Sequence, residues 1–363
     1  MASTSLPMNR ARRTTLVIGV PVAVALIAAC VPLWSRMALQ WVATNDIIGY
    51  AVAFSAPVQA GQVKVTSNNG DMVFRTSATA RRISVRGHLS SSVARPVFSR
   101  PDTATGLHLN SGCNVPFGTC TISFTVTAPA GLPVTLDDAF GQLTAGHLPG
   151  PVSLSDNSGD INTSDLGGQI HLNDQFGNID ATRLHGNIRV VNNSGDIDVA
   201  SLTGPIQLND QFGNINSSRL DGSTRLVNNS GDINVSGATG DTRLQDAFGN
   251  IDVAGLAAAS VVAANNSGDI TLRFATVPRQ VNVTDSFGNV TLILPAGSTA
   301  YQVHTHNSFG STSVSVAQSP ASPHVIRVSN NSGDIRIING DRPVPPSRAP
   351  RVRPVRPAHP ARH

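Results

Sequence analysis

Residues 191–215 read VNNSGDIDVASLTGPIQLNDQFGNI, and residues 226–235 repeat the start of this stretch as LVNNSGDINV. Their glycines belong to a series spaced by 18 residues: Gly141, Gly159, Gly177, Gly195, Gly213, Gly231 and Gly249. The series continues at wider spacing with Gly268, Gly288, Gly310 and Gly333, and a second series from Gly150 to Gly240 lies halfway. The unit is therefore nine residues. Such a short fixed period is the mark of a stacked repeat protein.

Apolar and polar residues alternate within each unit, as in Ile197-Asp198-Val199 and Ile206-Gln207-Leu208. This alternation, bounded by Gly and Asn, is typical of half-buried strands. Two strands per 18 residues predict an all-β fold, a parallel β-solenoid or β-helix, with successive glycines in successive turns about 4.8 Å apart. A sandwich of hairpins is the alternative. Hairpins, however, do not require the same residue every eighteen positions, which favours the solenoid.

The third residue before each glycine of the main series is Asp or Asn. We interpret these residues as a structural turn ladder, represented by Asp174, Asn192, Asp210, Asn228 and Asp246. From Asp174 to Asp246 the motifs DQFGN and NNSGD alternate, so in these turns acids do not face acids in adjacent turns, where like charges destabilise paired strands. Phe and Ser alternate before the glycine, which predicts that large and small side chains fill neighbouring layers. A structural calcium site is the functional alternative, although the G-G-x-G-x-D signature of calcium-binding repeats is missing.

The N-terminal region predicts export. Residues 1–13 contain three arginines and form a basic cytoplasmic segment, and residues 14–35 are 22 uncharged residues, long enough for a transmembrane helix. The positive flank predicts a signal anchor with the C-terminal ectodomain outside the cell, in a single-pass cell-membrane protein. A cleaved signal peptide is one alternative. Lipidation is another, because the sequence IAAC at 27–30 resembles a bacterial lipoprotein box at Cys30.

Cys113 and Cys120 lie seven residues apart with Pro116 and Gly118 between them. Outside the cytosol, such a pair most simply forms a disulfide that closes a loop. Zinc binding would require two more ligands, and no Cys or His cluster nearby supplies them.

Residues 339–363 form a Pro- and Arg-rich tail, which we expect to be disordered or polyproline II. From Asp341 onward it carries six arginines against one aspartate, whereas the whole chain has a net charge of +4. The remainder is therefore close to neutral, so the pI of about 9.5 does not indicate a nucleic-acid-binding protein. The tail is either a solvated extension or a segment attracted to anionic envelope polymer or lipid.

Three further segments complete the domain organisation. Residues 36–60 are a juxtamembrane linker, and residues 141–338 are the solenoid repeats. Residues 61–140 form an irregular β region with one repeat-like turn, NNGD at 68–71. We expect this region to cap the solenoid, because an open stack of strands needs atypical ends to cover its edges.

The segments TISFTVTAPAG at 121–131, LILPAGSTAYQVHTHNSFG at 292–310 and VIRVSNNSGDIRI at 325–337 flank or end the glycine-spaced strands. Their order and rhythm resemble the bacterial putative-adhesin family of unknown function, related to GIN-type autotransporter adhesin heads. The resemblance covers residues 61–338. It implies a β-helical ectodomain, commonly on a membrane anchor, and it implies no site residues.

No catalytic or cofactor-binding residues are predicted. The acids are distributed by the repeat, and no G-x-S-x-G motif marks a nucleophile. Arg189, Arg225 and Arg243 fall in one outward column of the second strand, with His171 further along it, and could bind an anionic cell-wall polymer or glycan. A solvated charged face is the ordinary alternative. The sequence therefore predicts a cell-surface protein with an adhesin-like or structural role, against an alternative role as a polysaccharide-processing enzyme or envelope-stress sensor.

Overall fold

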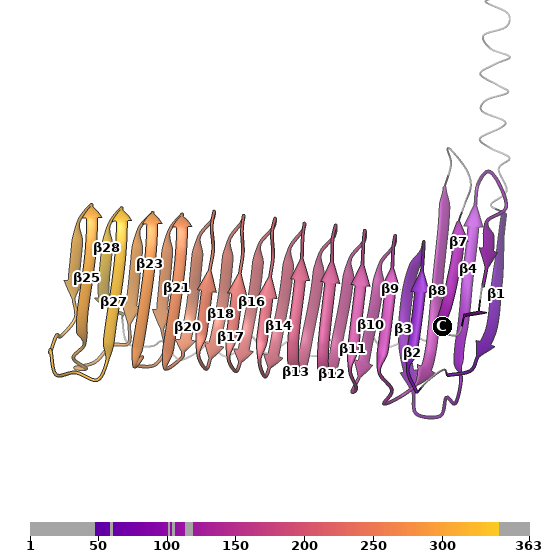
Figure 1. Cartoon of the computed structure of the whole chain (residues 1–363), viewed down its shortest axis with the longest axis horizontal. Coiled ribbons are helices and arrows are strands. Elements are labelled where there is room, and N and C mark those ends of the chain that lie inside the picture. Colours follow the sequence, from indigo (N-terminus) through magenta and orange to yellow (C-terminus); the bar gives the residue numbers. More distant parts are fainter. Residues whose placement is uncertain (1–47, 59–60, 101, 104–105, 113–118, 341–363) are drawn as a thin grey trace, which may run out of the picture. The chain divides into compact units, whose positions relative to one another are not determined.

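The computed structural model describes residues 48–58, 61–100, 102–103, 106–112 and 119–340, and every regular element in these ranges is a β-strand (Figure 1). None of the described residues belongs to a helix that is long and apolar enough to span a membrane. Residues 14–35, Cys30, Cys113 and the tail from Asp341 lie outside the described residues, so the predictions for them stay predictions.

The strands fall into three groups along the chain. The first group is β1 (Ile48–Ala56), β2 (Val63–Ser67), β3 (Asp71–Ser77), β4 (Ile83–Ser91), β5 (Val97–Ser99), β6 (Asp102–Thr103), β7 (Gly106–Gly112) and β8 (Cys120–Pro129). The regular repeats comprise β9 (Val134–Asp138), β10 (Leu143–Leu148), β11 (Val152–Asp156), β12 (Ile161–Asp174), β13 (Ile179–Asn192), β14 (Ile197–Thr203), β15 (Ile206–Asn209), β16 (Ile215–Asp221), β17 (Thr224–Val227), β18 (Ile233–Thr239), β19 (Thr242–Gln245) and β20 (Ile251–Ala257). The longer turns comprise β21 (Ser260–Ser267), β22 (Ile270–Phe274), β23 (Gln280–Phe287), β24 (Val290–Leu294), β25 (Gln302–Phe309), β26 (Thr312–Ser315), β27 (Val325–Ser332) and β28 (Ile335–Asn339).

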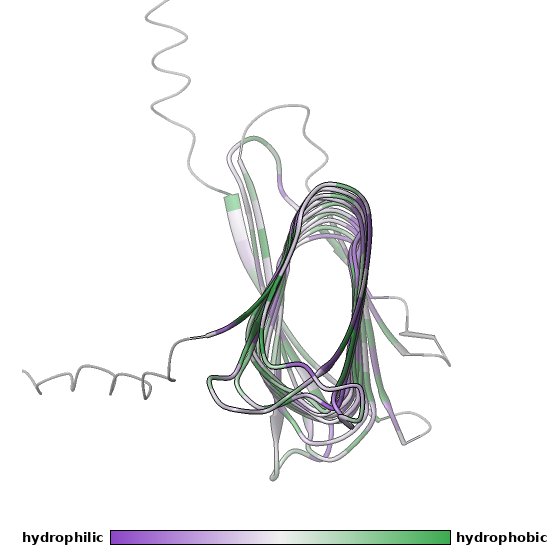
Figure 2. Cartoon of the chain, turned by 90° about the vertical axis from the view of Figure 1, so that its left-hand side faces the viewer, coloured by the Kyte–Doolittle hydropathy of each residue, from purple (hydrophilic) through white to green (hydrophobic). Residues whose placement is uncertain are grey.

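The predicted parallel β-solenoid is confirmed by the strand register. Ile161 pairs with Ile179, Ile179 with Ile197, and Ile197 with Ile215, always 18 residues apart and in parallel. Seen along the stacking direction, the turns superimpose (Figure 2). Their inward columns of Ile, Leu and Val are buried, including the recurring Leu166, Leu184 and Leu202 before the second bend. The apolar core therefore runs along the axis of the stack.

The stacking order at the C-terminal end of the repeats differs from the prediction of successive glycines in successive turns. Strand β27 pairs with both β23 and β25, and β28 pairs with both β24 and β26. The turn that comes last in sequence therefore lies between the two turns that precede it. In space, Gly288 is followed by Gly333 and then by Gly310, whose turn is the outermost of the three.

The same kind of insertion occurs before the regular repeats. The NNGD turn, formed by β2 and β3, pairs on one side with β9 and β10 and on the other with β7 and β8. Residues 63–77 thus form a regular turn of the solenoid. At both ends, an earlier or later segment of the chain is inserted between two other turns.

The chain bends at two kinds of position, at the glycines and within the strands that carry the buried Leu column. At the bend before the buried Leu column, non-glycine residues adopt positive φ, at His147 (59°), Asp165 (57°), Arg183 (55°), Ser201 (60°) and Arg219 (53°). Asp165 accepts two hydrogen bonds from Arg183, at 2.6 and 2.9 Å, and this contact is the first cause that lowers the pKa of its carboxyl. The sequence pattern did not reveal this column of strained residues, because their types differ from turn to turn.

The described residues 48–50, 89–97 and 119–121 belong to a separate compact unit. Within it, the Arg95 guanidinium lies 4.9 Å from the centre of the Tyr50 ring, and the Tyr50 hydroxyl donates to Pro96 O at 3.0 Å. The Thr119 N–H donates to Ser92 Oγ at 2.9 Å.

Candidate functional site

The turn ladder is a buried column at the glycine bend. Asp174 pairs in register with Asn192, and both side chains are at most 1% exposed. In the Asn turns the amide group donates to the glycine carbonyl of the preceding turn, as Asn192 Nδ2 does to Gly177 O and Asn228 Nδ2 does to Gly213 O, both at 2.9 Å. The Asp and Asn residues of the turn ladder do not adopt the left-handed conformation. Glycines and the residues directly before the buried Leu column adopt it instead. The ladder thus holds successive turns together by side-chain hydrogen bonds.

In the Asp turns a carboxyl oxygen takes the place of the Asn amide nitrogen, and when the carboxyl is ionised this oxygen carries no proton and cannot donate a hydrogen bond. Oδ2 of Asp138, Asp156, Asp174, Asp210, Asp246 and Asp285 is buried without a hydrogen-bond partner. Burial raises the pKa of Asp138, Asp174 and Asp210 to about 7, and that of Asp156, Asp246 and Asp285 to about 6. A protonated carboxyl can donate as Asn does, which is the physical reason to expect protons on this column. No group of three or more His, Cys, Asp or Glu side chains among the described residues is placed to hold a metal ion.

A second ladder follows the glycines and lies at the surface. Asp196 Oδ1 accepts the Asn214 N–H at 2.7 Å, and Asn214 Oδ1 accepts the Asp232 N–H at 2.9 Å. Acids alternate with amides in this ladder. The alternation places a carboxylate at every second turn, as the alternating DQFGN and NNSGD motifs predicted.

The expectation that Phe and Ser fill neighbouring layers is wrong. Phe176, Phe212 and Phe248 are 55–57% exposed, because they precede the glycines at the outer side of the bend. Their backbone carbonyls, not their rings, join the turns, as when Gly159 N–H donates to Phe176 O at 3.1 Å. The rings are therefore available at the surface.

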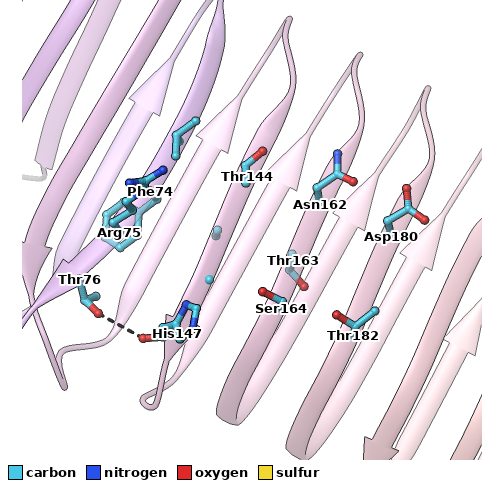
Figure 3. A pocket seen from close by; sticks show the side chains of 13 residues that line it. Phe74, Arg75, Thr76, Thr144, His147, Asn162, Thr163, Ser164, Asp180 and Thr182 are labelled. Atoms are coloured by element: carbon cyan, nitrogen blue, oxygen red, sulfur yellow. Dashed lines mark hydrogen bonds between the residues drawn. The ribbon is translucent and has the colours of Figure 1, made fainter. Parts of the chain in front are cut away.

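A groove lined by apolar backbone and small side chains together with polar side chains crosses the face formed by the strand that follows each main-series glycine (Figure 3). It has a volume of about 640 Å³ over β3, β10, β12 and β13, and a second hollow of about 320 Å³ shares Asp180 and Thr182 with it and continues over β14 and β16. Two outward columns line it: Thr144, Asn162, Asp180, Asp198 and Asn216 form the first, and Gly146, Ser164, Thr182, Ala200 and Ser218 form the second. Arg75 and His147 stand near one end (Figure 3).

The groove suits an extended ligand that follows the axis of the stack. Its walls present hydroxyl, amide and carboxylate groups at each turn, about 4.8 Å apart. Asp180 and Asp198 are register partners, and partial burial is the first cause, before the charge of Asp198, that raises the pKa of Asp180. The groove was not predicted from the sequence. Its signal was present in the recurring small hydroxyl residues at one outward position, Ser164, Thr182 and Ser218.

The structure places Arg189, Arg225 and Arg243 in one column on the second strand of the turns. Gln207 lies between the first two, whereas Arg225 and Arg243 are direct register partners, and His171 is the direct neighbour of Arg189. Arg189 donates to Gln207 Oε1 at 3.1 Å. The ion pairs among the described residues involve Asp165 and none of these arginines. This arginine column and the groove lie on different strands of each turn.

Residues 185–338 match the Toastrack DUF4097 family. No curated protein matches the chain. Among solved structures, the chain is similar to a putative cell adhesion protein from Clostridium sporogenes, with 10% identity and a TM-score of 0.19, covering 81% of this chain and 100% of that one. It is also similar to a putative adhesin from Bacteroides fragilis (15% identity, TM-score 0.26, 80% and 97% covered) and one from Parabacteroides distasonis (12%, 0.25, 81% and 98%). The similarity to the Toastrack DUF4097 family thus covers the later regular repeats and the longer turns, residues 185–338.

Proposed function

We propose that this chain is a non-catalytic, adhesin-like binding protein of the bacterial cell surface, and that its solenoid holds an extended, hydroxyl-rich glycan in the groove. The proposal includes the signal anchor at residues 14–35, the Cys113–Cys120 disulfide and the relation to GIN-type adhesin heads. The observation that carries the binding role is the continuity of the groove across successive turns, from Val73 to Ser218.

The composition of the groove sets the kind of glycan. Threonine and serine hydroxyls and the Asn162 amide can exchange hydrogen bonds with sugar hydroxyls, whereas Asp180 and Asp198 disfavour polyanions. None of the exposed phenylalanines lines the groove, so stacking on sugar rings adds little. Each hydrogen bond contributes only about 1 kcal/mol. Affinity should therefore depend on the number of turns that one polymer contacts.

We expect binding of neutral glycans to strengthen with oligosaccharide length, and to fall at least about ten-fold in the double variant Ser164→Tyr with Thr182→Tyr, whose rings fill the groove. Titration calorimetry with a length series of neutral β-linked oligosaccharides measures both effects. The control Ser153→Tyr carries the same ring on the second-strand face and should bind normally. Binding that is equal in the groove variant and the control would contradict the proposal.

The arginine column offers a second, separable surface for an anionic polymer. Arg225→Gln with Arg243→Gln should weaken binding of a uronate or phosphate polymer without changing neutral-glycan binding. Processing of the polymer is the alternative role, because Asp180 and Asp198 are register partners and most glycosidases use a pair of carboxyl groups. Release of new reducing ends that stops in Asp180→Asn, with binding retained, would establish that role instead.

The predicted signal anchor is tested by measuring which side of the membrane each part of the chain lies on. Protease added to intact cells should digest the chain after Arg36 and spare residues 1–13, because the positive flank stays in the cytoplasm. Mass spectrometry of the N-terminal peptide separates an intact anchor from a chain lipidated at Cys30. A solenoid that resists protease until the cells are lysed would show that the chain is not exported.

A further inference from the structure

A row of phenylalanine rings follows the glycine bends of the solenoid. Its members are Phe140, Phe176, Phe212, Phe248, Phe287 and Phe309, with exposed fractions from 55% to 71%. They are six of the nine large apolar side chains that are exposed among the described residues, so the apolar surface is concentrated rather than scattered. Concentrated apolar surface of this kind marks an interaction site.

The insertion of β27 between β23 and β25 keeps this row regular. In sequence order, Phe287 and Phe309 belong to consecutive turns, but in space Ser332 lies between them. A ring therefore recurs at every second turn along the whole stack, at a spacing of about 9.6 Å.

Acidic residues occupy the turns between the rings. Asp160, Asp196, Asp232, Asp269 and Asp334 each lie between two rings, and Asp71 lies in the turn beyond Phe140; each directly follows a glycine. Backbone donors of the next turn fix them at the surface: Asp269 Oδ1 accepts the Asn289 N–H and Asp334 Oδ1 accepts the Ser311 N–H, both at 2.8 Å. The edge of the solenoid thus alternates aromatic and acidic groups with a common period of two turns. We call it the Phe/Asp edge.

The tail of the same chain carries the complementary pattern. Residues 351–362 read RVRPVRPAHPAR and repeat every three positions: prolines at 354, 357 and 360, small apolar residues at 352, 355, 358 and 361, and basic residues at 353, 356, 359 and 362. A polyproline II helix has three residues per turn and rises about 9.3 Å per turn. In that conformation each kind of residue would occupy its own face, with a period that matches the Phe/Asp edge.

We propose that residues 351–362 dock along the Phe/Asp edge as a polyproline II helix, with proline rings on the phenylalanines and arginines beside the aspartates. Aromatic surfaces recognise proline-rich segments in this way, and guanidinium groups are also attracted to aromatic faces and carboxylates. A second copy of the solenoid suits this edge less well, because it would bring acidic groups against acidic groups.

The length of the chain permits docking within one molecule. Strand β28 leads away from the Gly333 bend, so the tail must return by about 20 Å, and ten residues from 341 to 350 can reach about 33 Å. Four triplets then extend about 37 Å. Their three prolines match the three rings nearest this end of the stack, Phe309, Phe287 and Phe248, and leave Phe140 and Phe176 free.

Limited trypsin digestion of the full chain tests the docking. The bond after Arg351 lies in the docked segment and is cleavable, the bond after Arg348 lies in the linker and serves as the internal reference, and Arg–Pro bonds resist trypsin. We expect the triple variant Phe248→Ser, Phe287→Ser and Phe309→Ser to be cleaved after Arg351 about ten-fold faster than wild type, since cleavage follows the population of the undocked tail. Serine occupies the same position in the alternate turns, so the fold tolerates it. The control Phe140→Ser with Phe176→Ser should match wild type.

Two further measurements make the result decisive. Asp269→Asn with Asp334→Asn should also accelerate cleavage, as should high salt, if charge contributes. Protection that is independent of protein concentration supports docking within one molecule, and protection that grows with concentration supports docking between copies. The proposal is overturned if the wild-type tail is cleaved as fast as a free peptide of residues 341–363, or if the phenylalanine variants abolish self-association while leaving tail cleavage unchanged.

Discussion

Gly195→Ala should destabilise the solenoid by about 3 kcal/mol or more, because positive φ costs a non-glycine residue about 1–3 kcal/mol and overpacking adds about 1–3 kcal/mol. Gly195 has a φ of 118°, and a Cβ there would overlap the carbonyl oxygen of Gly177 in the adjacent turn. The same carbonyl accepts the amide of Asn192, so it cannot move away without breaking a bond of the ladder.

Urea unfolding followed by circular dichroism measures this loss. Gly297→Ala is the matched control, because no atom lies within 4 Å of its added Cβ and its φ is not positive. Hydrogen exchange would locate the effect, which should be greatest in the turns of β13 and β14. Equal stability of the two alanine variants would mean that the glycine column is not a steric requirement.

The second large effect concerns two opposite substitutions in the buried turn ladder. Asn192→Asp should cost about 2 kcal/mol at pH 7.5, because it removes the donor to Gly177 O and leaves a buried carboxylate unsatisfied. Asp156→Asn should stabilise the protein by up to about 3 kcal/mol at the same pH, since its pKa is raised from 3.8 to about 6 and each unit corresponds to about 1.4 kcal/mol. Asp156→Asn also removes the negative charge that repels Asp138 and Asp174, the register partners of Asp156.

The sign of the pH dependence follows from the raised pKa values. Below about pH 4 these carboxyls are protonated in both the folded and the unfolded chain, so their burial costs little. As pH rises to about 6 or 7 the unfolded chain loses protons that the folded chain retains, and the free energy of unfolding falls. Wild type should therefore be most stable in mild acid, with Asn192→Asp showing a steeper loss and Asp156→Asn a shallower one.

Thermal melts at pH 4.5 and 7.5, each at low and high salt, check the pair. Because the ladder is buried, salt should change the differences little, unlike an exposed ladder of like charges. If instead the cost of Asn192→Asp disappears in high salt at pH 7.5, surface repulsion rather than the lost hydrogen bond would explain it.

The repeat period was enough to predict the solenoid, its parallel register and its buried columns, because stacking demands the same residue type at every turn. The order of the end turns was not predicted. Yet the sequence contains a signal: DSFGN at 285–289 is followed by NSFGS at 307–311, which places two Phe motifs in succession and breaks the alternation. Only the insertion of NNSGD at 330–334 between them restores it.

The candidate sites were harder to predict from the sequence. Alternation distinguishes inward from outward positions, but it does not show that Phe176 points to solvent at the bend or that Thr182 lies in a groove. Asn192 and Asp174 occupy the same position in the pattern. Their difference appears only when the carbonyl of Gly177 is placed opposite the amide.

The inserted turn formed by β27 and β28 has a consequence for how the protein is made. A chain that is synthesised or exported from its N-terminus can add turns one by one as far as β24. Strands β25 and β26 then have no strand to pair with until residues 325–339 arrive, since among the described strands β25 pairs with β27 and β26 pairs with β28. Completion of the stack thus depends on the last strands of the solenoid, β27 and β28. A truncated product that ends before Val325 would leave the β24 edge open, where chaperones and proteases could recognise it as unfinished.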